Sequence, residues 1–75
     1  MTTEQFKILC RAYWPDCYFA ESYGATYCYP DSWVRLGLDG GFAHGWIGEE
    51  ADELIVGKPE DNVKKVYNDM RSRDA

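Results

Sequence analysis

The chain has 75 residues, of which 45% are apolar and 28% charged, enough for one small domain over residues 1–75 but not for two. Its longest uninterrupted apolar run has four residues, Cys17 to Ala20, whereas a transmembrane helix needs roughly 20. Thirteen acidic and eight basic residues give a net charge of −5, which is the wrong sign for a general nucleic-acid binder.

The first segment has the pattern of an amphipathic helix over residues 3–14. Thr2 is placed to cap it, and Gln5 three residues later completes a capping box. Pro15 ends the helix because the residue before a proline disfavours helical geometry. Helical spacing predicts that one stripe faces the core: Phe6, Leu9, Cys10 and Tyr13.

Residues 17–48 have the composition of β-strands. The first is a short apolar run at Cys17 to Ala20, and a segment rich in Tyr and Thr follows to Tyr29. Alternate positions in that segment are small, which would let a helix approach closely: Gly24, Thr26 and Cys28. The opposite side of the segment carries tyrosines.

A β-hairpin is predicted over residues 32–47. Asp39-Gly40-Gly41 is a tight-turn signal between two strand-like runs, Ser32 to Leu38 and Phe42 to Ile47. In the first run, alternation places Val34, Leu36 and Leu38 on one face and Trp33 and Arg35 on the other. In the second run, the residues that share a face are Phe42, His44 and Trp46.

The remainder predicts an acidic loop or single helical turn at Glu49 to Glu53, and then a final helix over 59–72. Between them, Leu54 to Val56 is either an edge strand or a buried anchor. Pro59 suits the first position of a helix, and a stripe at helical spacing faces the core: Val63, Val66, Tyr67 and Met70. The expected fold is α+β, with an N-terminal and a C-terminal helix on one face of a three- or four-stranded antiparallel sheet.

No pattern in the chain indicates catalysis, a cofactor or a metal. His44 is the only histidine, and nothing beside it resembles a nucleophile elbow. The glycines do not have the spacing of a phosphate-binding loop. A zinc site built from His44 and three cysteines would lack the close ligand pair that structural zinc sites favour. We therefore expect reduced thiols at Cys10, Cys17 and Cys28, in a cytoplasmic protein that has no secretion signal.

Charge and aromatic residues suggest a partner-binding surface. Residues 49–62 contain six acids and one base, Lys58, and segregated charge steers association with a partner of opposite sign. Twelve aromatic residues are too many for the interior of so small a domain, and exposed Tyr and Trp are favoured anchors of interfaces. The candidate partner-binding residues are Glu49, Glu50, Asp52, Glu53, Glu60, Asp61, Tyr23, Tyr27 and Trp33.

In size, acidity, cysteine pattern and lack of a catalytic signature, the chain resembles small accessory proteins of phages and mobile elements, the anti-CRISPR and other anti-defence proteins among them. Some of these proteins present acids where DNA would bind. The resemblance implies a non-catalytic inhibitor that occupies the basic, nucleic-acid-binding surface of a larger protein such as a CRISPR effector. From the charge and the short apolar runs we expect no direct contact with nucleic acid or membrane, and we expect a monomer or weak homodimer. The alternative is a small regulatory or structural subunit that is acidic only for solubility.

Overall fold

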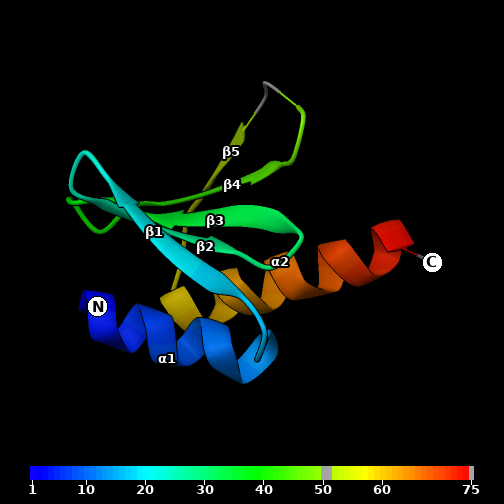
Figure 1. Cartoon of the computed structure of the whole chain (residues 1–75), viewed down its shortest axis with the longest axis horizontal. Helices are drawn as coiled ribbons and strands as arrows, with labels where there is room; N and C mark the ends of the chain where they lie inside the picture. The colour runs from blue at the N-terminus through cyan, green and yellow to red at the C-terminus, as the bar shows by residue number, and fades with distance from the viewer. Residues whose placement is uncertain (50–51, 75) are drawn as a thin grey trace.

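The fold is a five-stranded sheet with two helices, seen in a computed structural model that describes residues 1–49 and 52–74 (Figure 1). All strands pair antiparallel with their neighbours in sequence, so the sheet is a meander in the order β1-β2-β3-β4-β5. The predicted α+β class is confirmed, with five strands in place of three or four. The elements are α1 (Thr3–Tyr13), β1 (Tyr18–Ser22), β2 (Ala25–Tyr29), β3 (Ser32–Leu36), β4 (Phe42–Trp46), β5 (Asp52–Ile55) and α2 (Pro59–Asp74).

Helix α1 begins where the sequence predicts and ends one residue earlier than predicted. The Thr2 side chain accepts a hydrogen bond from the Gln5 backbone N–H at 3.1 Å, and the Gln5 side chain accepts one from the Thr2 N–H at 2.9 Å. This capping box satisfies two backbone donors that a helix start leaves free. The helix ends at Tyr13, two residues before Pro15.

Two tight turns shape the sheet. The predicted Asp39-Gly40-Gly41 hairpin is confirmed: the Gly37 N–H donates to the Gly41 carbonyl at 2.8 Å, and the Asp39 carboxylate accepts from the Gly41 N–H at 3.0 Å. The other turn joins β1 to β2 through Tyr23 and Gly24, both with positive φ, 52° and 79°. Positive φ at both central residues matches the twist of a two-residue hairpin.

Two predictions at strand ends are wrong. Leu38 was expected on the core face of β3, but that strand ends at Leu36 and Leu38 lies in the turn with 86% of its surface exposed. Ile47 was expected within β4, but the strand ends at Trp46 and Ile47 is also exposed. In both cases the turn takes one or two residues more than the apolar pattern indicates.

The edge strand β5 resolves the alternatives for Leu54 to Val56. It pairs with β4, with Leu54 opposite Ala43 and Ile55 opposite Phe42. Ile55 is buried while Leu54 and Val56 are exposed, so the segment is an edge strand with one side chain anchored in the core. Asp52 and Glu53, expected in a loop or helical turn, belong to this strand, whereas Glu50 and Ala51 lie outside the described residues.

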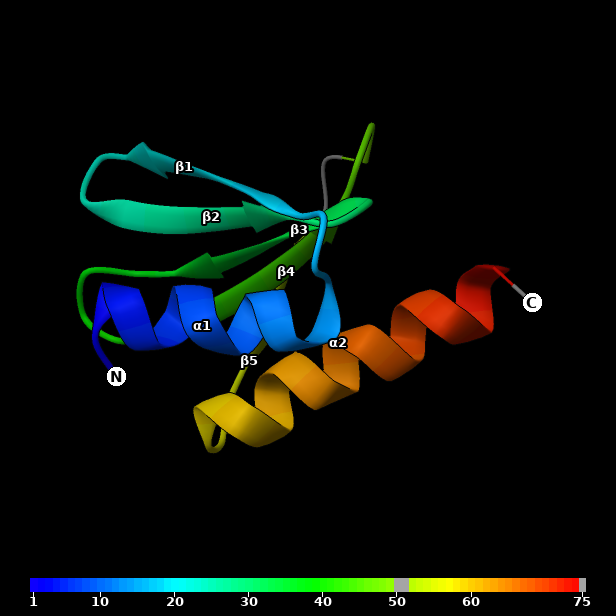
Figure 2. The ribbon, with the colours of Figure 1, turned by 60° about the horizontal axis from the view of Figure 1, so that its bottom comes forward.

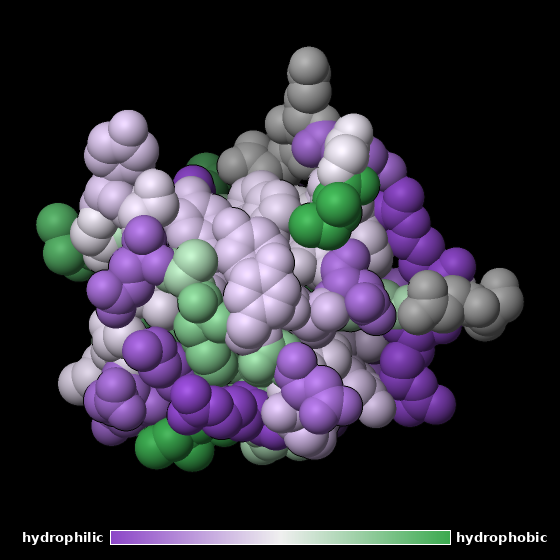
Figure 3. Space-filling model, in the orientation of Figure 1, coloured by the Kyte–Doolittle hydropathy of each residue, from purple (hydrophilic) through white to green (hydrophobic). Residues whose placement is uncertain are grey.

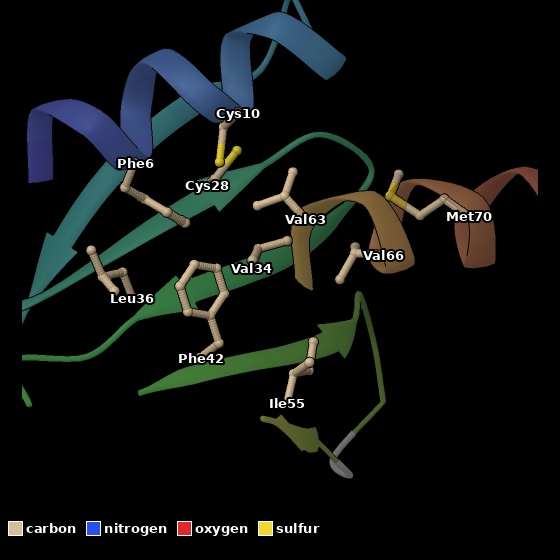
Figure 4. Close-up of a cluster of buried hydrophobic side chains, with 10 residues drawn as sticks. All are labelled: Phe6, Cys10, Cys28, Val34, Leu36, Phe42, Ile55, Val63, Val66 and Met70. Atoms are coloured by element: carbon tan, nitrogen blue, oxygen red, sulfur yellow. The ribbon is translucent and has the colours of Figure 1, made fainter. Parts of the chain in front are cut away.

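Both helices cover the same face of the sheet, as predicted, and lie side by side across it (Figure 2). Ten buried side chains converge between the two layers (Figure 4), and they come from both helices and from β2 to β5: Phe6, Cys10, Cys28, Val34, Leu36, Phe42, Ile55, Val63, Val66 and Met70. Two of the three small residues predicted on one side of this segment, Thr26 and Cys28, are buried in this layer, whereas Gly24 lies exposed in the β1–β2 turn. No described element covers the opposite face of the sheet.

Candidate functional site

The uncovered face of the sheet carries a row of four aromatic side chains. Alternation along the strands places them opposite the buried positions, because Cys28 and Val34 face the helices. Tyr18 on β1 lies directly across from Tyr29 on β2. We call this row the aromatic face: Tyr18, Tyr29, Tyr27 and Trp33.

The rings of the aromatic face stack on one another across three strands. The Tyr18 and Tyr29 ring centres are 5.1 Å apart at an interplanar angle of 17°, and those of Tyr29 and Tyr27 are 6.0 Å apart at 15°. Trp33 continues the row, with its ring 5.8 Å from Tyr27 and tilted by 59°. Burial and, next, the neighbouring hydroxyls of Tyr27 and Tyr18 raise the pKa of Tyr29. The Tyr29 phenol therefore stays neutral over the physiological pH range.

Trp33 lies against the backbone of Gly45 on the neighbouring strand. The two residues are opposite each other in the register of β3 and β4, and a Cβ atom at position 45 would overlap the indole ring. Glycine at this position therefore provides the space in which the ring lies. The Arg35 guanidinium lies 6.0 Å from the Tyr27 ring centre and 5.9 Å from that of Trp33, so a cation already rests over this row of rings.

A hollow of about 400 Å³ adjoins the aromatic face at its hairpin end. Tyr27 and Arg35 line it from the sheet, and Tyr23 lines it from the β1–β2 turn, where its side chain is fully exposed. Leu54 of β5 closes another side. The three aromatic residues predicted from the sequence, Tyr23, Tyr27 and Trp33, therefore lie on one side of the molecule.

The four predicted acidic residues with described side chains lie in two separate places. Glu49 contacts Arg73 of α2, and Glu53 lies 3.5 Å from Lys65 of the same helix, so both carboxylates have basic partners. Glu60 and Asp61 are exposed in the first turn of α2, which follows β5 in the chain, whereas Glu49 precedes that strand. Asp52 has its backbone in β5, and Glu50 lies outside the described residues.

The distribution of hydropathy over the surface agrees with this separation of charged and aromatic residues. In Figure 3, strongly hydrophilic residues gather along the lower and right-hand sides, where the helices lie, and residues of intermediate hydropathy fill the middle, over the strands.

Sequence reasoning missed Tyr18 and Tyr29 as members of the aromatic face. Alternation in residues 25–29 already places Tyr29 on the same side as Tyr27, whereas Tyr18 joins them only through the pairing of β1 with β2.

His44 is part of the core and not of an open site. It is 3% exposed, its Nε2 atom lies 3.2 Å from the Ser32 hydroxyl, and Ser32 donates to the Met70 sulfur. Burial lowers the pKa of the imidazole; Asp69 and Glu53 oppose this effect. Because Ser32 is fully buried, a substrate cannot reach this Ser–His pair in the folded state.

The three cysteines are free thiols close to one another beneath α1. Cys10 and Cys28 are buried and Cys17 is partly buried. The neighbouring Cys10 thiol and burial raise the pKa of Cys28. Burial also raises the pKa of Cys17, to about 12. The Cys17 and Cys28 thiols are thus protonated near neutral pH, the form that is a poor nucleophile and a poor metal ligand.

Within residues 1–49 and 52–74, no group of three or more His, Cys, Asp or Glu side chains is arranged to hold a metal ion. Neither helix, over its described residues, has the length and apolar character needed to cross a membrane. Comparison with protein-family models, curated proteins and solved structures gives no match to this chain.

Proposed function

We propose that the protein is a non-catalytic binding protein of the cytoplasm that occupies the basic, nucleic-acid-binding surface of a larger protein. The observation that carries this proposal is the uncovered aromatic face in a chain of net charge −5. A partner of this kind includes effectors of host defence, in line with the resemblance to anti-defence proteins.

The aromatic face suits a surface rich in arginine and lysine. Ring faces attract guanidinium and ammonium groups, and this attraction strengthens when water is excluded. The molecule uses the same contact internally: Arg73 lies 4.1 Å from the Trp46 ring centre, and Arg11 lies 5.0 Å from that of Phe19. Tyr and Trp also dominate the energetic centres of protein interfaces because they bury large areas with few rotatable bonds.

The acidic residues contribute mainly through their long-range field. Glu49 and Glu53 already contact Arg73 and Lys65 of α2. They can pair with basic residues of a partner only by giving up these contacts. Glu60 and Asp61 form no ion pair with any side chain in the described ranges. Single exposed ion pairs are worth roughly 0–1 kcal/mol. The expected role of the acids is therefore to raise the association rate with a basic partner.

Direct binding of single-stranded nucleic acid is the main competing use of an exposed row of aromatic rings. Such proteins combine stacking with a positively charged groove that follows the phosphates. Arg35 is the one cation that contacts the aromatic face among the described residues. A single arginine in a chain of net charge −5 favours a protein partner over a nucleic acid.

Capture from host lysate, treated with nuclease and run at low and high salt, tests the proposal. We expect the wild type to retain a nucleic-acid-binding protein at low salt and to release it when its nucleic acid is added. The variant Tyr29→Ser/Trp33→Ser should lose binding about tenfold or more, since hot-spot residues each contribute about 2 kcal/mol or more. Glu60→Lys/Asp61→Lys should slow association and flatten its salt dependence.

The matched control is Ile8→Ser, which changes an exposed apolar residue on α1, on the other side of the molecule. Capture that is equal for wild type and Tyr29→Ser/Trp33→Ser contradicts the role of the aromatic face. Capture that is indifferent to salt and to nucleic acid contradicts the choice of partner. It would favour instead the alternative of a regulatory or structural subunit whose acidity serves solubility.

A further inference from the structure

The free edge of β1 is open for strand pairing. β1 pairs only with β2, and four of its five residues are exposed. In a two-residue hairpin the residues that flank the turn, here Ser22 and Ala25, form a hydrogen-bonded pair. Alternation then directs the backbone N–H and C=O groups of Phe19 and Glu21 away from β2. These groups are the ones that another strand would engage.

Side chains along this edge carry opposite charges within a short distance. Phe19 lies on the helix side of the sheet, with the Arg11 guanidinium 5.0 Å and the Lys7 ammonium 5.8 Å from its ring centre. Glu21 follows two residues later on the same side of the strand and is exposed. None of these three charged residues forms an ion pair with another described side chain. The edge therefore has a basic end and an acidic end.

We propose that β1 pairs antiparallel with β1 of a second copy of this chain, with Ala20 on the two-fold axis. This register sets Phe19 opposite Glu21 of the second copy, so the free backbone groups of both residues form the hydrogen-bonded pair. It also brings that Glu21 beside Arg11 and Lys7. The two-fold axis creates the same contact a second time, and the two sheets join into one.

Charge selects both this register and this edge. A shift that sets Glu21 opposite Glu21 of the second copy would place like charges directly across from each other, which is destabilising. At the other edge of the sheet, β5 contains Asp52 and Glu53 and follows Glu49. Two copies meeting there would bring their acidic residues together, and edge charges of this kind are a common barrier to strand pairing.

The proposed dimer would extend the aromatic face. The dimer itself does not depend on the proposed function. Tyr18 lies on β1 and is 66% exposed, so pairing through β1 would bring the aromatic rows of both copies onto one continuous sheet face. Because only five residues pair in each copy, the interface is smaller than those of permanent dimers. We expect a dimer that forms and dissociates with concentration.

Sedimentation velocity from micromolar to millimolar concentration tests the dimer, with circular dichroism to verify that each variant is folded. The wild type should shift from monomer toward dimer as concentration rises. Glu21→Arg and Arg11→Glu should each weaken association by about tenfold or more, and the double variant that exchanges the two charges should restore it. Glu60→Arg makes the same charge change away from the edge and should leave dimerisation unaltered.

A crosslink tests the register. In a Cys17→Ser background, Ala20→Cys should form an intermolecular disulfide readily, because residues on the axis in a non-hydrogen-bonded pair have Cα atoms about 4.5 Å apart, a separation that a disulfide spans. Ser22→Cys, which faces Tyr18 of the second copy in this register, should crosslink far more slowly. A wild type that is monomeric throughout the range overturns the proposal. So does a double charge exchange that fails to restore association, or crosslinking that is equal at positions 20 and 22.

Discussion

The two faces of the sheet use the same strands for different purposes. On the side of the helices, Cys28 and Val34 are fully buried, and the residues of this layer are mostly aliphatic or small. One position further along each strand, Tyr29 and Arg35 lie on the uncovered side and keep part of their surface in water. The period-two geometry of a strand lets stability and recognition be encoded by alternate residues with little interference. Substitutions on the two faces should therefore have separable effects.

The largest contrast is expected between Phe6 and Tyr18. Phe6 is 0% exposed and makes edge contacts with Phe19 and Phe42, so Phe6→Ala should destabilise the fold by roughly 3–5 kcal/mol. Tyr18 is exposed and, among the aromatic residues that the structure describes, stacks on Tyr29 alone, so Tyr18→Ala should cost about 0.5–1.5 kcal/mol. Urea unfolding measures both free energies.

Because a small domain has little stability to lose, Phe6→Ala can unfold completely. Phe6→Leu then serves as the milder variant and should cost less than about 1.5 kcal/mol. Equal losses for the alanine variants of Phe6 and Tyr18 would mean that the two faces contribute alike to folding.

An intermediate effect is expected at Gly45, where the uncovered face is tightly packed. Gly45→Ala would force the Trp33 ring off the strand, and overpacking of this kind costs roughly 1–3 kcal/mol. The cost should largely disappear in a Trp33→Ala background, which removes the ring that the new methyl group meets. A double-mutant cycle measures this coupling. A cost that is unchanged in the Trp33→Ala background would place the strain in the backbone and not in the indole ring.

The smallest effect concerns His44, on the covered face. Burial lowers the pKa of its imidazole below the ordinary value of 6.5, so the unfolded chain takes up a proton before the folded chain does. Its contribution to stability is therefore fully present above pH 6.5 and is lost as the pH falls from 6.5 through the pKa of the folded state. Unfolding free energies measured across this window should show the loss. In the His44→Gln variant the unfolding free energy should change less with pH across this window. If the same pH dependence persists in that variant, it arises from carboxylates and not from His44.

Local signals account for most of the architecture. The Thr2–Gln5 capping box, Pro15 and the Asp39-Gly40-Gly41 turn each act within four or five residues, so the sequence alone places α1 and the β3–β4 hairpin. The β1–β2 turn was missed because Tyr23 is not a residue that normally adopts positive φ. The strand at Asp52–Glu53 was missed because acidic residues are uncommon in strands. They are tolerated here on an edge strand with solvent beside it.

The candidate site was harder to predict than the fold. Glu49 and Glu53 meet Arg73 and Lys65, which are 24 and 12 residues away in sequence, and no local pattern reveals such pairs. The aromatic face was predicted only in part. Alternation shows which residues share a side of a strand, but it does not show which side of the sheet the helices will cover. Tyr18 and Trp33 join Tyr27 and Tyr29 only when the strands are assembled in register.

The meander order of the sheet also has a kinetic consequence. Every strand pairs with the strand next to it in the chain, so each hairpin closes a short loop and can form before its neighbours do. Proteins dominated by such local pairings fold faster than those that must join distant segments. The contact between α1 and α2 connects the two ends of the chain, and closing that large loop costs the most chain entropy. We therefore expect the docking of the two helices on each other to be the late step of folding, after the sheet has formed.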